Sequence, residues 1–491
     1  MNLSRFSRRA SHEVRIGQTS IGAANPIAVQ SMTNTSTADV DASVAQIERI
    51  ADAGAPIVRL TAQGKREGEA LRDIVAKIRH EGYSTAIVAD IHFVPEIASI
   101  AAESVDKVRV NPGNYRTEGG EFEALIEKCR ARGVALRIGV NHGSLARHIV
   151  ATHGDTPQGM VASAMEFLER CRKADFDQVV VSMKSSNTRV MVHAYRLLVE
   201  AMEREQMTYP IHLGVTEAGN GIEGRIKSAV GIGALLADGV GDTIRVSLTE
   251  APENEVPVAK MLVDYFSSRE GEFEVLHPER YSPTEYRRRT SAAIVSHAEV
   301  TDQYVVIDAT SANPTAEWRA AILNRDDARP VVIRRHYEGT SEEVALHAAA
   351  DMGALLLDGL ADGVWIDAPH ISAEELNAME LTILQASRAR FTQTEYIACP
   401  SCGRTLYNIE QALADIKART SHLKGLKIGV MGCIVNGPGE MADADYGYVG
   451  AGAGRISLYK GKECVERNIP QEEALEHLIE IIKANGDWKE Q

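Results

Sequence analysis

Three cysteines and a glutamate in the C-terminal part of the chain have types and spacing suited to metal or redox chemistry. Cys399-Pro-Ser-Cys402 follows an apolar run and precedes a helical stretch, and Cys433 follows a second apolar run thirty-one residues later. Glu440 comes seven residues after Cys433, in IVNGPGE. Two sulfurs at this spacing can hold one metal centre, and neighbouring backbone N–H groups can donate to its sulfurs.

The spacing leaves three interpretations open. A structural zinc site normally has four closed Cys or His ligands, one more than these cysteines supply. A thioredoxin-like dithiol uses the CxxC pair and leaves Cys433 without a role. A [4Fe–4S] cluster on three cysteines leaves one iron for an exchangeable ligand, where substrate chemistry can occur. Cys129, Cys171 and Cys464 are outside this group, and we expect them to pack as ordinary side chains.

A second set of chemically capable residues recurs at the carboxyl ends of apolar runs in the first half of the chain. Residues i and i+2 of a strand share a face. This places together Arg59 with Thr61, Asp90 with His92, Arg109 with Asn111, Arg137 with Asn141, Ser182 with Lys184, and Arg245 with Ser247.

Several cations converging on one cavity indicate a diphosphate or polyphosphate site, because an unpaired buried charge is costly. The alternative is a closed network of arginines and carboxylates, for which only Asp90, Glu217 and Glu250 offer charge nearby. Glu217, in LGVTEAGNG, is the best acid–base candidate, the alternative being a salt bridge to Lys184 or Arg245. For His92 and His142, a structural hydrogen bond is favoured over substrate contact.

The elements that must position these residues alternate between strand and helix. Short β-type runs occur at 27–32, 57–61, 86–92, 107–112, 135–142, 179–184, 211–217 and 242–248, and helical stretches with apolar residues at i, i+3 and i+4 separate them. Eight such units within about 250 residues predict a (β/α)₈ TIM barrel, whose active site lies at the carboxyl ends of its strands.

We expect three domains in a chain of 491 residues: the barrel at 1–268, an α/β insert at 269–385 and the cysteine-bearing α/β domain at 386–491. The insert is predicted to be a spacer without substrate contacts. The net charge of −15 makes a nucleic acid or an anionic membrane an unlikely kind of partner, and no apolar run approaches the ~18 residues of a membrane span. The clustered cysteines favour a reduced, cytoplasmic setting.

Five motifs, KVRVNPGN, VSMKSSN, LGVTEAG, CPSCGR and MGCIVNGPGE, make the sequence resemble the 4-hydroxy-3-methylbut-2-enyl diphosphate synthases, iron–sulfur enzymes of the methylerythritol phosphate route to isoprenoids. The resemblance covers 5–265 and 380–491. It implies a barrel that binds 2-C-methyl-D-erythritol 2,4-cyclodiphosphate, and a cluster domain resembling sulfite and nitrite reductase modules.

The resemblance also assigns residues. It implies a [4Fe–4S] cluster on Cys399, Cys402, Cys433 and Glu440, and an acid–base role for Glu217, with Glu440 also taking part in catalysis. The implied substrate-binding residues are Arg59, Arg109, Arg137, Asn141, Lys184, Arg245, Ser247 and Asn436.

The implied reaction is reductive ring opening and dehydration of the cyclodiphosphate, with electrons from ferredoxin or flavodoxin, in a homodimer. The insert of about 120 residues departs from the family, whose long form carries a whole extra barrel, so we interpret the chain as a long-form relative with a shortened insert. Whether the cluster domain covers its own barrel or a partner's is left open. A non-catalytic iron–sulfur sensor and a zinc-bearing barrel transferase related to pterin synthases are the alternatives.

Overall fold

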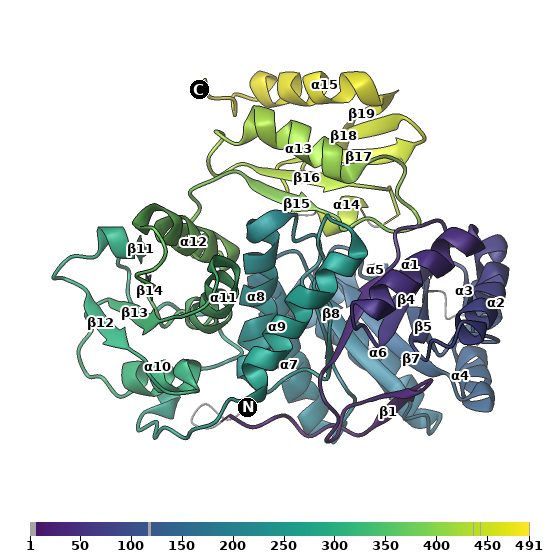
Figure 1. Cartoon of the computed structure of the whole chain (residues 1–491), viewed down its shortest axis with the longest axis horizontal. Coiled ribbons are helices and arrows are strands. Elements are labelled where there is room, and N and C mark those ends of the chain that lie inside the picture. The colour runs from purple at the N-terminus through teal and green to yellow at the C-terminus, as the bar shows by residue number, and fades with distance from the viewer. Residues whose placement is uncertain (1–5, 116–118, 436, 442, 491) are drawn as a thin grey trace.

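The chain forms an eight-stranded barrel with two further sheets beside and above it (Figure 1). In this computed structural model, residues 6–115, 119–435, 437–441 and 443–490 are described. Within them, no helix is both long and apolar enough to cross a membrane.

The first sheet is the predicted (β/α)₈ barrel. Its order is β8-β7-β6-β5-β4-β3-β10-β9, all neighbours are parallel, and a bridge between Val181 and Ile211 joins the two ends. The strands are β3 (Ala28–Met32), β4 (Ile57–Ala62), β5 (Ala86–Ile91), β6 (Lys107–Val110), β7 (Ala135–Asn141), β8 (Val179–Lys184), β9 (His212–Leu213) and β10 (Thr243–Ile244). The last two strands are shorter than the sequence runs predicted, because the chain leaves regular pairing after two residues in each.

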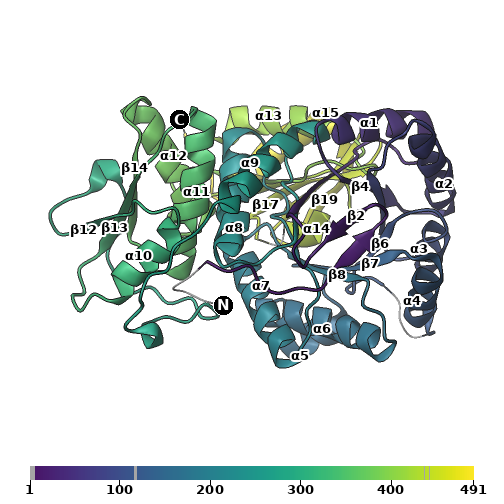
Figure 2. The ribbon, with the colours of Figure 1, turned by 60° about the horizontal axis from the view of Figure 1, so that its bottom comes forward.

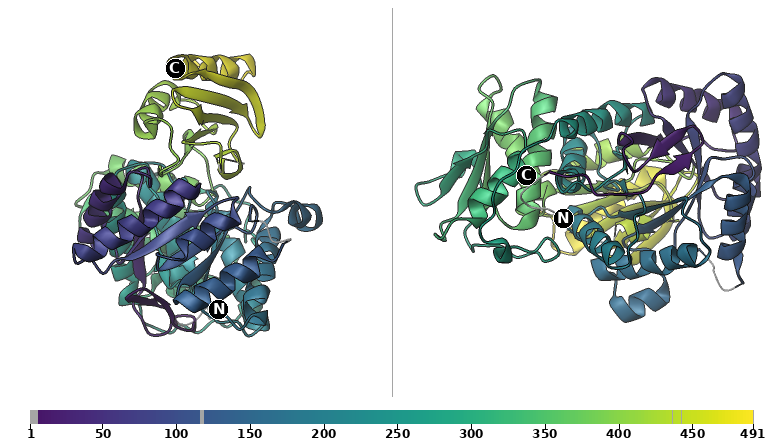
Figure 3. Two further views of the ribbon diagram at one scale, coloured as in Figure 1. Left: turned by 90° about the vertical axis from the view of Figure 1, so that its right-hand side faces the viewer. Right: turned by 90° about the horizontal axis from the view of Figure 1, so that it is seen from below.

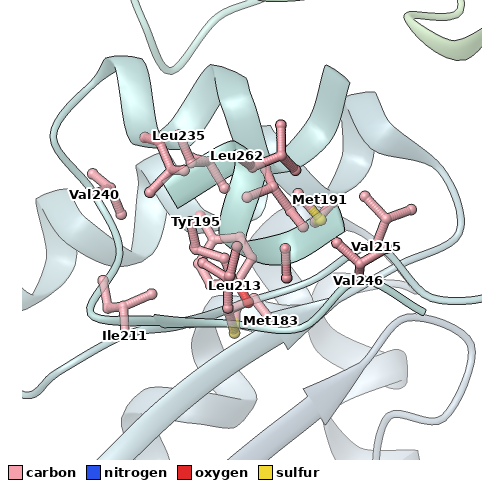
Figure 4. Close-up of a cluster of buried hydrophobic side chains, with 14 of the residues drawn as sticks. Met183, Met191, Tyr195, Ile211, Leu213, Val215, Leu235, Val240, Val246 and Leu262 are labelled. Atoms are coloured by element: carbon pink, nitrogen blue, oxygen red, sulfur yellow. The ribbon is translucent and has the colours of Figure 1, made fainter. Parts of the chain in front are cut away.

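An outer ring of helices covers the barrel. It comprises α1 (Val40–Asp52), α2 (Lys65–His80), α3 (Pro95–Ala101), α4 (Glu121–Arg132), α5 (Arg147–His153), α6 (Pro157–Lys173), α7 (Thr188–Arg204), α8 (Gly221–Ala237) and α9 (Glu255–Ser267), with a short 3₁₀ turn η1 (Pro252–Asn254) before α9. In α1, for example, the Asp39 side chain accepts from the Ala42 N–H at 3.1 Å, and Val44, Ile47 and Ile50 face inward. Figure 4 shows apolar side chains from β8, from the segments containing β9 and β10, and from α7, α8 and α9 meeting in one core.

The amino end of the barrel is covered by an antiparallel hairpin of β1 (Val14–Ile16) and β2 (Thr19–Ile21). Val14, Ile16 and Ile21 are completely buried and pack in one cluster with residues at the beginnings of barrel strands, such as Ile57 and Ala86. The hairpin therefore forms an apolar floor at the end of the barrel where such folds keep stability rather than chemistry.

The second sheet belongs to the predicted α/β insert. It is parallel, with order β11-β14-β13-β12, and comprises β11 (Val295–Ser296), β12 (Val305–Asp308), β13 (Val331–His336) and β14 (Gly363–Asp367). Its helices are α10 (Pro314–Leu323), α11 (Ser341–Asp358) and α12 (Ala373–Ala386), with 3₁₀ turns η2 (Pro278–Arg280) and η3 (His297–Glu299).

The insert is fused to the barrel through α11, which lies against α8 (Figure 2). The helices approach so closely that a Cβ on Gly233 would lie 2.6 Å from the Cα of Ala350. Beside this contact, a four-charge network links the two units at N–O separations of 2.8 Å, each side chain at most 3% exposed; its members are Arg196, Asp238, Arg319 and Asp358. Tyr281, from the segment between α9 and the insert sheet, donates to Asp358 at 2.7 Å.

The third sheet has order β15-β16-β17-β18-β19, parallel across the first three strands and antiparallel across the last three. It comprises β15 (Glu395–Ala398), β16 (Lys427–Met431), β17 (Tyr446–Gly452), β18 (Arg455–Lys460) and β19 (Glu463–Pro470), with α13 (Ile409–Thr420), α14 (Gly437–Glu440) and α15 (Gln471–Ala484). The Gly-rich stretch 450–454 lies in the β17–β18 hairpin.

This C-terminal unit rests on the mouth of the barrel of its own chain (Figures 1 and 3). The sequence had not decided between this barrel and the barrel of a partner chain. Ala218, after β9, forms a bridge with Ala398 at the end of β15. On another side, the loop after β7 meets α14 at a pair of glycines: a Cβ on Gly143 would lie 2.0 Å from the carbonyl oxygen of Gly439.

Candidate active site at the barrel mouth

Between the barrel mouth and the C-terminal unit lies a cavity. Its lining includes every predicted site residue that the structure describes: Arg59, Arg109, Arg137, Asn141, Lys184, Glu217, Arg245, Ser247, Cys399, Cys402, Cys433 and Glu440. The remaining predicted residue, Asn436, lies outside the described residues. The barrel strands thus supply one wall and the cysteine-bearing loops supply the other.

The cations share the inner face of the barrel because parallel register aligns their strands. Met32 pairs with Arg59, Asp90 with Arg109, and Arg109 with Arg137. Arg109 is held on two sides, since Nη1 donates to Asp90 at 2.7 Å and Nη2 donates to the Gly139 carbonyl at 2.8 Å. A Cβ on Gly139 would lie 2.4 Å from Arg109 Nε, so glycine is what leaves room for this guanidinium.

The set of carboxylates that the sequence predicted beside the cations needs correction at two residues. Glu255, which the sequence interpretation missed, takes Arg245 bidentately at 2.9 and 3.0 Å, whereas Glu250 pairs with Arg225 outside the cavity. Glu255 opens α9 and is 1% exposed. The signal for it in the sequence is weak: an acidic residue at the start of an apolar helix, ten positions after an arginine.

Three of the cations keep an excess of positive charge in the cavity. Lys184 has no carboxylate within ion-pair distance among the described residues, Arg137 donates to His212 Nδ1 at 2.6 Å, and Arg59 reaches Asp90 only at 3.9 Å. Burial lowers the pKa of all three, to about 10 for Arg59, and the other cations add to the effect for Arg137 and Lys184. An anion in the cavity would relieve both the burial cost and the repulsion.

Glu217 lies on the loop after β9 with a left-handed backbone, φ +50°, unusual for a glutamate. It is 3% exposed, and one carboxyl oxygen, Oε2, has no hydrogen-bond partner in the part of the chain that the structure describes. Burial raises its pKa well above the usual range, and the neighbouring Glu440 carboxyl raises it further. The sequence interpretation named a bridge to Lys184 or Arg245 as the alternative to an acid–base role. The carboxyl of Glu440, rather than either cation, is the charged neighbour that most affects Glu217.

The three thiols come from loops that follow parallel strands. Cys399 and Cys402 follow β15, and Cys433 follows β16. The Gly432 N–H donates to Cys399 Sγ at 3.3 Å, and burial raises the pKa of both Cys399 and Cys433. Among the described residues, no three His, Cys, Asp or Glu side chains are grouped to hold a single metal ion, so the thiols share a cavity rather than a single-ion site.

The donor set fits an iron–sulfur group. Buried thiols become strong ligands once a cation displaces their protons, and backbone N–H groups nearby can donate to sulfur. Arg404 also lines the cavity, and its buried Nε and Nη1 have no hydrogen-bond partner among the described residues, as expected where an anionic group belongs. Arg404 was missed as a site residue although it stands in the CPSCGR motif.

Both histidines are structural. His92 Nε2 lies 2.9 Å from Arg109 Nη1 and its Nδ1 lies 3.2 Å from Asn114 Nδ2, while His142 faces the Asp155 carbonyl at 3.4 Å. Neither lines the cavity.

Comparison with known proteins supplies the family. The GcpE TIM-barrel domain model matches residues 11–260, and the GcpE protein C-terminal domain model matches residues 395–484. A relative from Porphyromonas gingivalis is 46% identical and one from Phocaeicola vulgatus 45%, each with 100% of both chains covered. Both are named 4-hydroxy-3-methylbut-2-en-1-yl diphosphate synthase (flavodoxin).

The chain belongs to the 4-hydroxy-3-methylbut-2-en-1-yl diphosphate synthase family. Membership makes it an oxidoreductase of isoprenoid biosynthesis, and the family depends on iron–sulfur chemistry. The sensor and the zinc-bearing transferase are thereby set aside.

The two family matches leave 261–394, which includes the insert, unmatched. The Phocaeicola synthase aligns over 613 positions against the 491 residues of this chain, so that relative carries segments absent here. Among solved structures, 7,8-dihydropteroate synthase from Vibrio fischeri is 13% identical, covering 52% of this chain and 99% of that chain with a TM-score of 0.36, too low to carry any argument.

Proposed function

We propose that the cavity binds 2-C-methyl-D-erythritol 2,4-cyclodiphosphate and that the chain reduces and dehydrates it to 4-hydroxy-3-methylbut-2-enyl diphosphate. The single observation that carries this proposal is the pairing of two unlike walls in one cavity. Arginines and a lysine from the barrel face thiols and a carboxyl group from the C-terminal unit of the same chain.

The barrel wall accounts for diphosphate binding. Arg59, Arg137 and Lys184 carry charge that no close carboxylate among the described residues balances, and guanidinium groups can hold phosphate oxygens bidentately. Asn141 and Ser247 add neutral hydrogen-bonding groups beside them. Arg245 is prepaired with Glu255 and is therefore held in place before substrate arrives.

The opposite wall would hold a [4Fe–4S] cluster on Cys399, Cys402 and Cys433, with Glu440 as a fourth, exchangeable ligand. Such a group supplies single electrons and a Lewis-acidic iron for the oxygen that must leave carbon. Glu440 is held on the barrel side by Asn141, whose Nδ2 donates to Oε1 at 2.6 Å. We place Asn436 beside the substrate on family resemblance alone.

Glu217 is proposed as the proton donor to the departing hydroxyl group. Burial and the neighbouring Glu440 carboxyl raise the pKa of Glu217, which favours the protonated carboxyl, and burial keeps that proton from water. The seated C-terminal unit contributes by excluding solvent from the space between the walls.

The proposal also includes the electron donor, the cellular location, the oligomeric state and the domain boundaries. Flavodoxin stands in the names of the relatives, and we propose flavodoxin, or a ferredoxin, as the electron donor. We also propose a cytoplasmic location, a homodimer, and domains at 1–268, 269–385 and 386–491, with the insert acting as a shortened spacer.

The decisive experiment is anaerobic purification followed by a visible spectrum and assays of iron, sulfide and zinc. We expect iron and sulfide near four each per chain for a cubane, and loss of most iron and of the brown colour in Cys399→Ser, Cys402→Ser and Cys433→Ser. Cys464→Ser, from the same unit but outside the cavity, is the matched control and keeps its iron. Zinc alone in the unaltered protein, or full iron in all three variants, contradicts the proposal.

A further inference from the structure

Arg404 projects from the cysteine-bearing loop at the point where that loop presses on the barrel. It lies two residues after Cys402, and its side chain lines the cavity. The preceding residue, Gly403, packs so tightly that a Cβ there would lie 2.6 Å from the Thr35 carbonyl oxygen and 2.8 Å from Thr61 Oγ1. The backbone that carries Arg404 is therefore held by contact with the barrel.

The guanidinium group lacks partners for two of its nitrogens. Nε and Nη1 are buried and make no hydrogen bond to the described residues, a costly state for a charged group. Burial lowers the pKa of Arg404, but the negative groups around it outweigh this and leave the pKa above its ordinary value. The side chain is thus a fixed positive charge with N–H groups still to be used.

The neighbouring charges indicate which ligand those N–H groups meet. The groups that favour the charged form of Arg404 are, in order, Cys402, Asp90, Cys433 and Glu440. Three of these four are proposed iron ligands. The diphosphate wall already has its cations on the barrel strands, whereas Arg404 arrives from the opposite unit beside the thiols.

We propose that Arg404 donates N–H hydrogen bonds to sulfur of the iron–sulfur group and that its charge favours the reduced state of that group. The inference rests on the proposed function, because it requires the cluster to be bound. Reduction adds one negative charge, and a buried cation stabilises the reduced form more than the oxidised form. Asp90, on the barrel, also favours the charged form of Arg404, so the guanidinium lies in the field of both units.

The test compares anaerobically prepared holoprotein with the variants Arg404→Gln and Arg404→Lys. Iron and sulfide content, a redox titration followed by electron paramagnetic resonance, and cyclodiphosphate affinity by calorimetry are measured for each. Arg404→Gln should lower the reduced-to-oxidised ratio at a fixed potential on the order of tenfold, equivalent to about 59 mV for one electron. Arg404→Lys should fall between it and the unaltered protein, and substrate affinity should change by less than about threefold.

Arg419→Gln is the matched control, since Arg419 lies on α13 of the same unit, exposed and paired with Glu476. Its potential should equal that of the unaltered protein. If Arg404→Gln cannot be loaded, Arg404→Lys carries the test, and a folded Arg404→Lys without iron counts against the inference. An unchanged potential, or a tenfold loss of substrate affinity at unchanged potential, overturns it. Absence of iron and sulfide from the unaltered protein overturns the proposed function itself, which keeps the two failures distinct.

Discussion

The barrel meets its two neighbouring units in different ways. Against the insert it presents helices in close contact and two buried charges, Arg196 and Asp238, which pair with each other and with Arg319 and Asp358 of the insert. Against the C-terminal unit it presents loop ends. Asn187 donates to Asp443 at 2.7 Å, Ser186 to the Glu440 carbonyl at 3.1 Å, and Thr249 to the Cys399 carbonyl at 3.1 Å.

This difference in contacts indicates that the junction between barrel and insert is permanent, whereas the junction between barrel and C-terminal unit can open. Separating the insert from the barrel would leave buried charges without their ion-pair partners, which costs several kcal/mol. Lifting the C-terminal unit at its Gly143–Gly439 edge would expose mostly neutral hydrogen-bonding groups, which water can satisfy. Lys227 and Glu395 form a buried pair at 3.1 Å near the start of β15, and this pair can persist as a pivot. Changes at the insert should therefore alter stability, and changes at the mouth should alter turnover.

The largest effect at the mouth is expected for Glu217→Gln. The change keeps shape but removes the proton, so turnover should fall by about 10²–10⁴-fold while iron content and substrate binding stay near normal. Steady-state rates with a chemical reductant measure this. Glu250→Gln, which disturbs the Arg225 pair outside the cavity, should retain its rate. Normal turnover by Glu217→Gln would show that the proton has another source.

At the insert junction, Asp358→Asn should lower the free energy of unfolding by about 3–5 kcal/mol, because Arg196 and Arg319 are left buried without full compensation. Denaturant titration measures the loss, and turnover per folded molecule should be unchanged. Asp326→Asn, whose side chain is 88% exposed in its pair with Arg280, should change stability by less than about 1 kcal/mol. A large loss of turnover in Asp358→Asn would erase the contrast between the two junctions.

The glycine contact gives the next prediction. Gly143→Ala places a methyl group where the Gly439 carbonyl lies and should hold the C-terminal unit off the mouth, slowing turnover by about 10²-fold with iron retained. Gly133→Ala is the control, since Gly133 also has a positive φ, +66°, but has open space around it. Equal losses in the two variants would assign the effect to backbone strain rather than to seating.

Lys184→Ala should weaken cyclodiphosphate binding by about 1.5–3 kcal/mol. The pKa of Lys184 is depressed in the ligand-free protein, and a bound diphosphate raises it, so binding takes up protons between the two pKa values and affinity falls as pH rises through that window. Calorimetry in buffers of different ionisation enthalpy detects the uptake. Ser247→Ala removes a neutral neighbour and should leave proton uptake intact; uptake that persists in Lys184→Ala would assign it to another group.

The smallest effect is expected for Lys417→Ala. Lys417, on α13, reaches Glu223 of α8 at 2.8 Å in a partly exposed pair that joins the C-terminal unit to the barrel. Its loss should change stability by less than about 1 kcal/mol and raise KM only slightly, and the difference should vanish in high salt. Arg419→Ala, whose pair stays within the C-terminal unit, should leave KM unchanged. A loss of iron in Lys417→Ala would mean that this edge supports the thiols directly.

The barrel and its cationic wall could be predicted because both depend on local periodicity. Two-residue alternation placed Arg59, Arg109 and Arg137 on one face, and parallel register aligned those faces. The side-chain contacts between segments that are far apart in the sequence could not be predicted. Glu255 neutralises Arg245 from a helix rather than a strand, and Arg404 lines one cavity with the barrel residues only because the C-terminal unit sits on its own barrel. No spacing rule in a single sequence encodes that placement.

The β1–β2 floor closes the barrel at the end opposite the cavity. Val14, Ile16 and Ile21 are buried against residues of the barrel strands, whereas the cavity is lined by residues toward the carboxyl ends of those strands and by the C-terminal unit. The hairpin can therefore stabilise the barrel without contacting the cavity.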